Sequence, residues 1–110
     1  MLLSTDLWVG ALIRRAELAG AFATVARKGD PRAGAVLVKL YNPITREARL
    51  YAQALRSEGE TVWMQPAGAE TESDLDAFIA RQRGYDPDLW VVEIEDREGR
   101  HFLTEPVEPK

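Results

Sequence analysis

The chain of 110 residues has no cysteine, a formal net charge of −4, and 45% hydrophobic and 29% charged residues. The lack of cysteine excludes disulfides, thiol catalysis and thiolate-bound metals. The negative charge argues against whole-molecule attraction to nucleic acid or to an anionic membrane surface. The balance of apolar and charged residues is typical of one globular domain.

We expect this domain to comprise residues 1–104. Residues 105–110 include two prolines, which pair poorly in a sheet, so we expect a frayed tail there. No apolar run is long enough to span a bilayer, and residues 1–6 lack the basic region and long apolar stretch of a signal peptide. The expected location is therefore the cytoplasm, without membrane association.

The spacing of apolar residues predicts two helices. The first begins within residues 4–6, whose Ser, Thr and Asp side chains can all cap a helix, and it ends before Gly20. The second begins at Ser73, with Asp76 three residues later as a weak capping box, and ends at Gly84. Its apolar face carries leucine, phenylalanine and isoleucine at helical spacing.

Runs rich in β-branched and aromatic residues predict five strands. They lie at residues 21–27, 35–41, 49–55, 61–65 and 89–95. Short turns join the first four, so we expect an antiparallel meander. Residues 100–103 predict a short additional edge strand. The sequence therefore predicts an α+β fold in which an antiparallel sheet of four to six strands carries two helices mainly on one face.

The register of the sheet follows from matching apolar faces, because a slip of one residue turns every side chain to the other face. A three-residue loop ending at Gly59 pairs Ala54 with Val62, and the preceding turn pairs Leu40 with Leu50. The predicted helix-covered face consists of Val36, Val38, Leu40, Leu50, Ala52, Ala54, Val62 and Met64. The other face consists of Leu37, Lys39, Tyr41, Arg49, Tyr51, Gln53, Leu55, Trp63 and Gln65.

The second face is the candidate partner-binding surface. Aromatic side chains with a mixed polar rim are typical of recognition surfaces, and here the rim surrounds two aromatic residues. The candidate residues are Lys39, Arg49, Tyr51, Trp63 and Gln65. The alternative is that the first helix or the last strands cover this face as a second core layer. On the first reading, the protein is a non-enzymatic binding or adaptor module for a protein or peptide, or it forms a homo-oligomer.

Acidic residues around Trp90 give the rival hypothesis. Asp86, Asp88 and Glu93 offer carboxylates for a metal-dependent hydrolase or a nucleotide-handling enzyme. Asp86 and Asp88 have a simpler use, which is to satisfy backbone groups of the turn around Pro87. A single histidine excludes a zinc site built from several imidazoles. We therefore favour a protein without metal or cofactor.

The glycines of residues 29–36 have the spacing of a phosphate-binding loop, but Ala35 and Val36 stand where that loop needs lysine and serine or threonine. A connecting loop with permissive glycines fits these residues better.

Three blocks of the sequence, at residues 4–15, at 27–30 with 33–35, and at 86–96, resemble those of a family of short alphaproteobacterial proteins. It is domain-of-unknown-function family 1491, whose proteins have about the length of this chain. The resemblance covers almost the whole chain. It implies a bacterial, cytoplasmic protein, and it transfers no activity and no catalytic residue.

Overall fold

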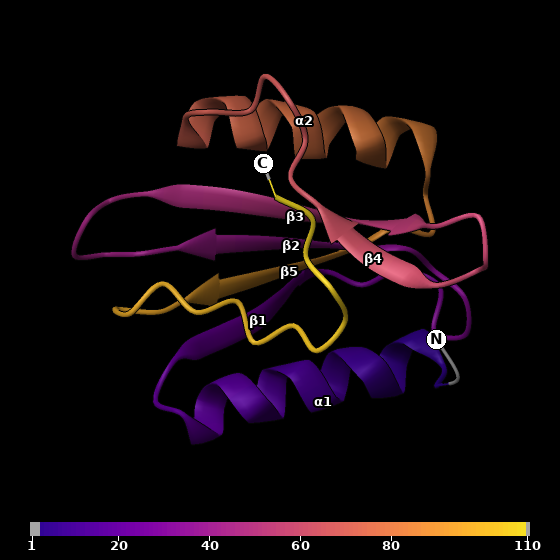
Figure 1. Ribbon diagram of the computed structural model, residues 1–110, viewed down its shortest axis with the longest axis horizontal. Helices are drawn as coiled ribbons and strands as arrows, with labels where there is room; N and C mark the ends of the chain where they lie inside the picture. Colours follow the sequence, from indigo (N-terminus) through magenta and orange to yellow (C-terminus); the bar gives the residue numbers. More distant parts are fainter. Residues whose placement is uncertain (1–2, 110) are drawn as a thin grey trace.

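Two helices enclose a five-stranded sheet in the computed structural model, which describes residues 3–109 (Figure 1). The elements in chain order are α1 (Thr5–Leu18), β1 (Phe22–Arg27), β2 (Val36–Tyr41), β3 (Ala48–Leu55), β4 (Thr61–Met64), α2 (Glu72–Tyr85) and β5 (Trp90–Glu95). The predicted α+β class and this element order are confirmed. Neither helix is long and apolar enough to cross a membrane, within the part of the chain that the structure describes.

The sheet is mixed, with the strand order β1-β5-β2-β3-β4. The predicted meander placed β1 beside β2, but β5 lies between them, antiparallel to β1 and parallel to β2. The reason is burial. Strands β5 and β2 carry apolar side chains on both faces, which suits the centre of a sheet covered on both sides. Strand β1 is exposed along most of its length and takes an edge.

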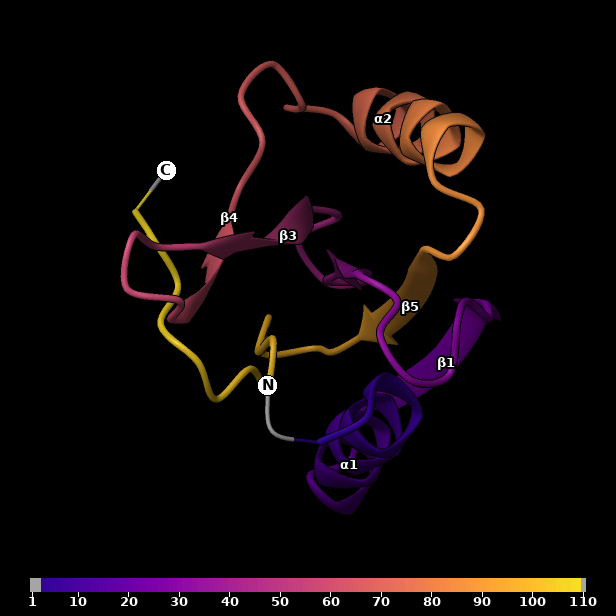
Figure 2. The same cartoon turned by 90° about the vertical axis from the view of Figure 1, so that its right-hand side faces the viewer.

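The helices cover opposite faces of the sheet, whereas the sequence predicted both mainly on one face (Figures 1 and 2). Helix α1 packs Trp8, Val9 and Leu12 against one face. Helix α2 packs Leu75 and Ile79 against the other. Because each helix packs on a different face, both faces of the sheet must be apolar, and the central strands β5 and β2 carry apolar side chains on both. The result is a three-layer domain with one core on each side of the sheet.

The register between β3 and β4 agrees with the prediction, since Ala54 pairs with Val62 and Ala52 with Met64. Gly59 takes the expected positive φ, at 79°. The register between β2 and β3 is shifted by one residue, so that Leu40 pairs with Arg49 rather than with Leu50.

The connecting loop explains the shift between β2 and β3. Residues 42–47 form a loop closed by a hydrogen bond from Asn42 N–H to the Glu47 carbonyl (2.9 Å), with Arg46 at a φ of 63°. The Asn42 side chain also accepts from the backbone N–H of Ile44 (2.9 Å). This loop sets β3 one residue out of the predicted phase. The side chains of β3 and β4 therefore join the opposite face of β2.

Helix α2 begins two residues earlier than predicted, because its N-cap is Thr71 and not Ser73. Thr71 is the N-cap, and it forms a reciprocal capping box with Asp74, whose backbone N–H donates to Thr71 Oγ1 (3.1 Å). Ser73 lies inside the helix, and so does Gly84. The Thr71 pair is the better box because the acidic side chain reaches back to the N-cap N–H (3.1 Å).

The loop at residues 29–35 ties α1 to the start of β5. Thr5 Oγ1 donates to the Gly34 carbonyl (2.9 Å), and Trp90 Nε1 donates to the Asp30 carbonyl (2.7 Å). A Cβ added at Gly34 would collide with the Asp88 carbonyl oxygen and would lie 2.8 Å from the Trp90 ring. The glycines that resemble a phosphate-binding loop therefore serve a close backbone approach.

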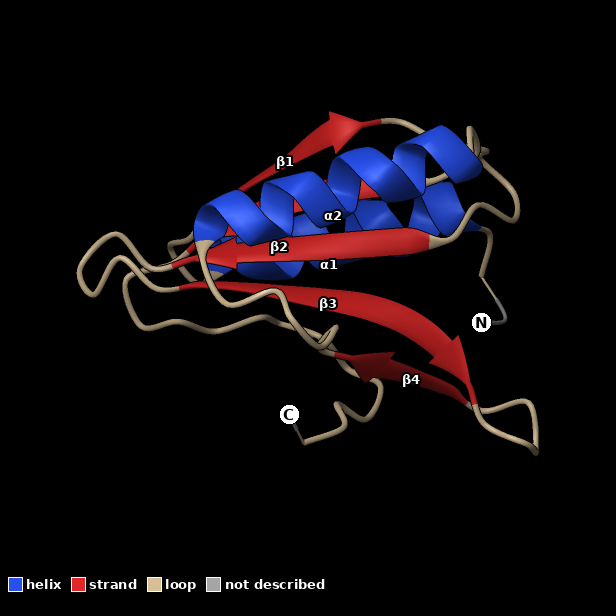
Figure 3. Cartoon of the chain, turned by 90° about the horizontal axis from the view of Figure 1, so that it is seen from above, coloured by secondary structure: helices blue, strands red, loops and turns tan. Residues whose placement is uncertain are grey.

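Residues 104–108 lie along β4, at the edge opposite β1 (Figure 3). Trp63 N–H donates to the Pro106 carbonyl, and Glu108 N–H donates to the Trp63 carbonyl, each at 2.8 Å. The sequence predicted fraying here because proline pairs poorly. In this segment, however, Pro106 contributes its carbonyl, which proline retains, while Glu108 supplies the donor. Residues 100–103, predicted as a strand, have no strand structure.

Gly34→Ala is expected to lower the free energy of unfolding by about 1–3 kcal/mol, because the added methyl collides with backbone rather than with a movable side chain. The matched control is Gly10→Ala in α1, where an added Cβ meets nothing within 4 Å. There we expect a gain of about 0.5–1 kcal/mol from the better helix propensity of alanine. Urea denaturation followed by circular dichroism measures both. Equal stability of Gly34→Ala and the parent protein would contradict the role of the loop.

Candidate functional site

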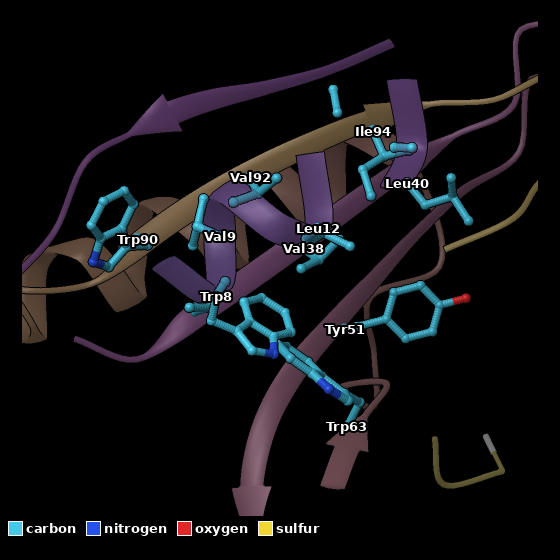
Figure 4. Close-up of a cluster of buried hydrophobic side chains, with 13 residues drawn as sticks. Trp8, Val9, Leu12, Val38, Leu40, Tyr51, Trp63, Trp90, Val92 and Ile94 are labelled. Carbon is cyan, nitrogen blue, oxygen red and sulfur yellow. The ribbon is translucent and has the colours of Figure 1, made fainter. Parts of the chain in front are cut away.

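The predicted aromatic surface is a layer of the core under α1. Trp63 is 0% exposed and Tyr51 is 4% exposed. Trp63 stacks on Trp8 of α1, with ring centroids 5.4 Å apart (Figure 4). Burial of Tyr51 raises the pKa of its hydroxyl. Of the two readings of this face, the structure therefore supports the second core layer.

Glu105 binds both stacked indoles. Trp63 Nε1 donates to Glu105 Oε1 (3.0 Å), and Trp8 Nε1 donates to Glu105 Oε2 (3.2 Å). Burial by itself raises the pKa of this carboxyl, but hydrogen bonds from the two indoles, from its own backbone N–H and from Thr104 together outweigh burial, and the pKa lies below its ordinary value. A single carboxylate thus satisfies two buried donors and fixes residues 104–108 to α1 and β4.

Lys39 lies on the other face of the sheet, beneath α2, and is 8% exposed. Its Nζ contacts Asp76 Oδ1 (2.8 Å) and Glu72 Oε2 (2.9 Å), which lie one turn apart on α2. Burial lowers the pKa of Lys39, but the hydrogen bonds to these two carboxylates outweigh it and raise the pKa overall. Lys39 therefore anchors α2 to β2 rather than forming the rim of an aromatic surface.

Arg49 and Gln65 lie near one another outside the buried Tyr51 and Trp63 cluster. Both line a hollow of about 460 Å³ beside the start of α2. Arg49 is exposed and pairs with Glu47 at 3.4 Å. The five predicted residues are consequently divided between the two faces of the sheet and do not form one surface.

The acidic residues of the rival hypothesis do not form a metal site among the described residues. Asp86 Oδ1 accepts from the backbone N–H of Asp88 (3.0 Å), which is the turn role expected around Pro87. Glu93 lies on β5 and faces α2. Residues 3–109 contain no group of three or more His, Asp or Glu side chains placed to hold a metal ion.

The exposed apolar residues identify a different surface, at the outer edge of β1. Phe22 is 74% exposed and Val25 is 40% exposed. Strand β1 pairs with β5 on its inner side, and no other described strand or segment pairs with it. Figure 3 shows β1 at one margin of the sheet and β4 at the other. The edges differ because residues 106–108 cover β4, whereas β1 is bare.

A groove runs beside this open edge, between α2 and β1. It consists of two hollows of about 340 and 220 Å³ that meet at Glu93. The first is lined by Phe22, Ala23, Thr24, Lys39, Tyr41, Glu72, Glu93, Ile94 and Glu95. The second is lined by Ala26, Arg27, Asp76, Ile79, Ala80, Arg83, Val91 and Glu93. The groove exists because α2 packs over β2, β3 and the start of β5, and leaves β1 and the end of β5 uncovered.

The charges along this groove are of two signs. Glu95 is exposed at the Phe22 end and Glu93 is exposed where the two hollows meet, and their side chains have no hydrogen bond or ion pair with any described residue. Arg27 and Arg83 line the other end. The Nε of Arg27 is buried and has no hydrogen-bond partner within residues 3–109. An extra residue in β1, between Val25 and Arg27, turns Arg27 toward this groove.

This surface was not predicted from the sequence, because the predicted meander set β1 beside β2 and gave β5 no position between them. One signal was available. Strand β1 carries mainly small residues, such as Ala23 and Ala26, whereas its neighbours in space, β5 and β2, carry large apolar residues such as Ile94 and Val38. Such a difference favours β1 as an edge.

These features define a small three-layer α+β domain with one covered and one open sheet edge. The chain belongs to the family described as "Protein of unknown function (DUF1491)", whose profile matches residues 3–104, and the predicted resemblance is thereby confirmed. No curated protein matches the chain.

Solved structures of the family share the fold. The crystal structure of a DUF1491 family protein from Caulobacter crescentus is 67% identical, with a TM-score of 0.94, covering 97% of this chain and 100% of that one. An NMR structure of a DUF1491 family protein from the same organism gives 67% identity and a TM-score of 0.92, covering 99% of each chain. The solution structure of a protein from A. tumefaciens is 34% identical, with a TM-score of 0.81, covering 100% of this chain and 99% of that one.

Glu105→Ala is expected to lower stability by about 1–3 kcal/mol, because two buried indole donors lose their acceptor. The pKa of Glu105 is lowered in the folded protein, so its contribution is present above the ordinary glutamate pKa and is lost as the pH falls through the folded value. The stability difference between parent and variant should therefore become smaller in acid. Glu58→Ala, at an exposed turn, is the control, and a pH-independent difference for Glu105→Ala would contradict the proposed bonding.

Lys39→Met retains the apolar stem and removes the charge that binds α2. We expect a stability loss of roughly 1 kcal/mol at neutral pH. Because the pKa of Lys39 is raised, its contribution is complete below the ordinary lysine value of 10.5 and disappears as the pH rises through the folded value. Thermal unfolding of both proteins across the alkaline range tests this, and a constant difference would contradict it.

Proposed function

We propose that the protein is a small non-enzymatic binding module that takes an extended segment of a partner protein or peptide along the outer edge of β1. The observation that carries this proposal is the contrast between the two sheet edges. Residues 106–108 add main-chain hydrogen bonds to β4, while β1 offers its outer backbone groups to solvent. An unpaired edge strand is ready to pair with a strand from another chain.

Strand addition suits the side chains around β1. In this mode, main-chain hydrogen bonds supply affinity, and pockets for alternate side chains supply specificity. Phe22 and Thr24 lie across from Glu95 and Glu93 of β5, so they share the face that carries the groove. An added strand would place every second side chain above this groove. The groove then provides apolar and charged contacts, and β1 provides the backbone contacts.

A peptide selection tests the proposal. A display library of random octapeptides is selected on the immobilised protein, and the enriched peptides are measured for binding to the parent and to Val25→Lys. Lysine on an edge strand opposes pairing, so we expect at least about a tenfold loss of affinity in that variant. Amide hydrogen exchange should also slow in residues 22–27 when peptide binds.

Ile44→Lys is the matched control. Ile44 is a 66% exposed apolar residue in the loop between β2 and β3, away from β1, and its replacement should leave peptide affinity unchanged. Equal binding to Val25→Lys and the parent, or the enrichment of no binding peptide at all, would contradict the proposal.

A further inference from the structure

We infer that the strand pairing with β1 is β1 of a second copy of this chain, so that the protein forms a two-fold dimer through its open edge. This inference rests on the proposed function, because it names the partner of the same edge. Two lines of observation carry it: the order of charges along the groove, and the sizes of the side chains along β1.

The charges are arranged for self-pairing. Glu95 lies at the Phe22 end of the groove, and Glu93 lies where the two hollows meet. Arg27 and Arg83 line the other end, where the carboxylate Asp76 is already paired with Lys39. Two antiparallel β1 strands are related by a two-fold axis perpendicular to the sheet, and this axis reverses one copy relative to the other. The acidic end of each groove then faces the basic end of the other. A partner of one charge sign would complement only half of the groove.

The side chains of β1 also complement one another by size. With the axis at Thr24, Phe22 lies opposite Ala26 of the second copy, and Ala23 lies opposite Val25. A large side chain thus meets a small one on each face of the sheet. Opposite residues share a face in an antiparallel pair, so the α2 face of one copy continues into the α2 face of the other.

Groups without partners in the single chain gain partners in the dimer. Glu93 and Glu95 lack a counter-charge among the described residues, and the buried Nε of Arg27 lacks an acceptor. Thr24, which pairs with Glu93 of β5, is small, so a long basic side chain from the second copy can reach across β1 toward this carboxylate. Since the contact is confined to one strand and its flanks, we expect weak, salt-sensitive association in the micromolar to millimolar range.

A charge exchange tests the dimer. One variant carries Glu93→Lys with Glu95→Lys, and the other carries Arg27→Glu with Arg83→Glu. Each makes both ends of its groove the same sign, so two identical copies repel. Sedimentation velocity over a concentration series should show dissociation constants raised at least about tenfold for each variant alone. A mixture of the two variants restores opposite charges at both ends, and it should associate about as tightly as the parent protein.

The control variant is Glu58→Lys with Glu60→Lys. It changes the same number of charges at the same spacing on exposed residues of the β3–β4 turn, away from the groove. Its association should match that of the parent. Melting temperatures of all variants establish that each is folded, and the mixture keeps the test decisive because only folded chains restore association.

The outcomes separate this inference from the proposed function. Restored association in the mixture, with slowed exchange of the β1 amides in the parent dimer, supports the second copy. A parent protein that stays monomeric throughout the series overturns it, and so does a dimer that tolerates both charge reversals. Neither result affects the outcome of the peptide selection, which tests peptide binding at the β1 edge independently of dimer formation. If both proposals hold, edge-binding peptides should compete with dimer formation.

Discussion

The close contact between residues 29–35 and the start of β5 is the constraint on which the fold depends. Asp30 N–H donates to the Asp88 carbonyl (3.0 Å), and Trp90 N–H donates to the Ala35 carbonyl (2.8 Å). These bonds hold β5 beside the entry to β2, where it separates β1 from β2. The backbones approach so closely that Gly29 and Gly34 have no room for a side chain. Because Thr5 also bonds to this loop, the start of α1 is set by the same contact.

Local patterns predicted the elements well, and they failed where the arrangement depends on distant contacts. The helices, the strand positions and the β3–β4 register follow from apolar spacing and from Gly59, whose positive φ a turn requires. The position of β5 does not follow from local patterns, because a strand late in the chain can pair at either edge of a sheet or between two earlier strands. Its apolar side chains on both faces were the physical reason to place it centrally.

The predicted aromatic surface failed because the β2–β3 register is shifted by one residue. The β2–β3 loop places Arg46 at positive φ. Because arginine rarely adopts this conformation, its presence in a sequence does not predict such a turn. Once β3 is out of phase with β2, Tyr51 joins the face of Val38, while Lys39 faces the opposite helix. Two buried tryptophans still implied an acceptor for their indole N–H groups, and Glu105 was the nearby carboxylate that pattern analysis had assigned to a frayed tail.

Residues 106–108 occupy the β4 edge of the sheet, so that β1 is the one bare edge in the described part of the chain. A sheet with two bare edges can add copies at both sides, and head-to-tail addition at unlike edges produces open filaments. Here β4 is already occupied by the chain's own residues, held by Glu105 through the stacked tryptophans. One bare edge permits a single closed pair and no further growth. The carboxylate that joins Trp8 to Trp63 therefore also keeps the β4 edge closed to strand addition, although it lies at the sheet edge opposite β1.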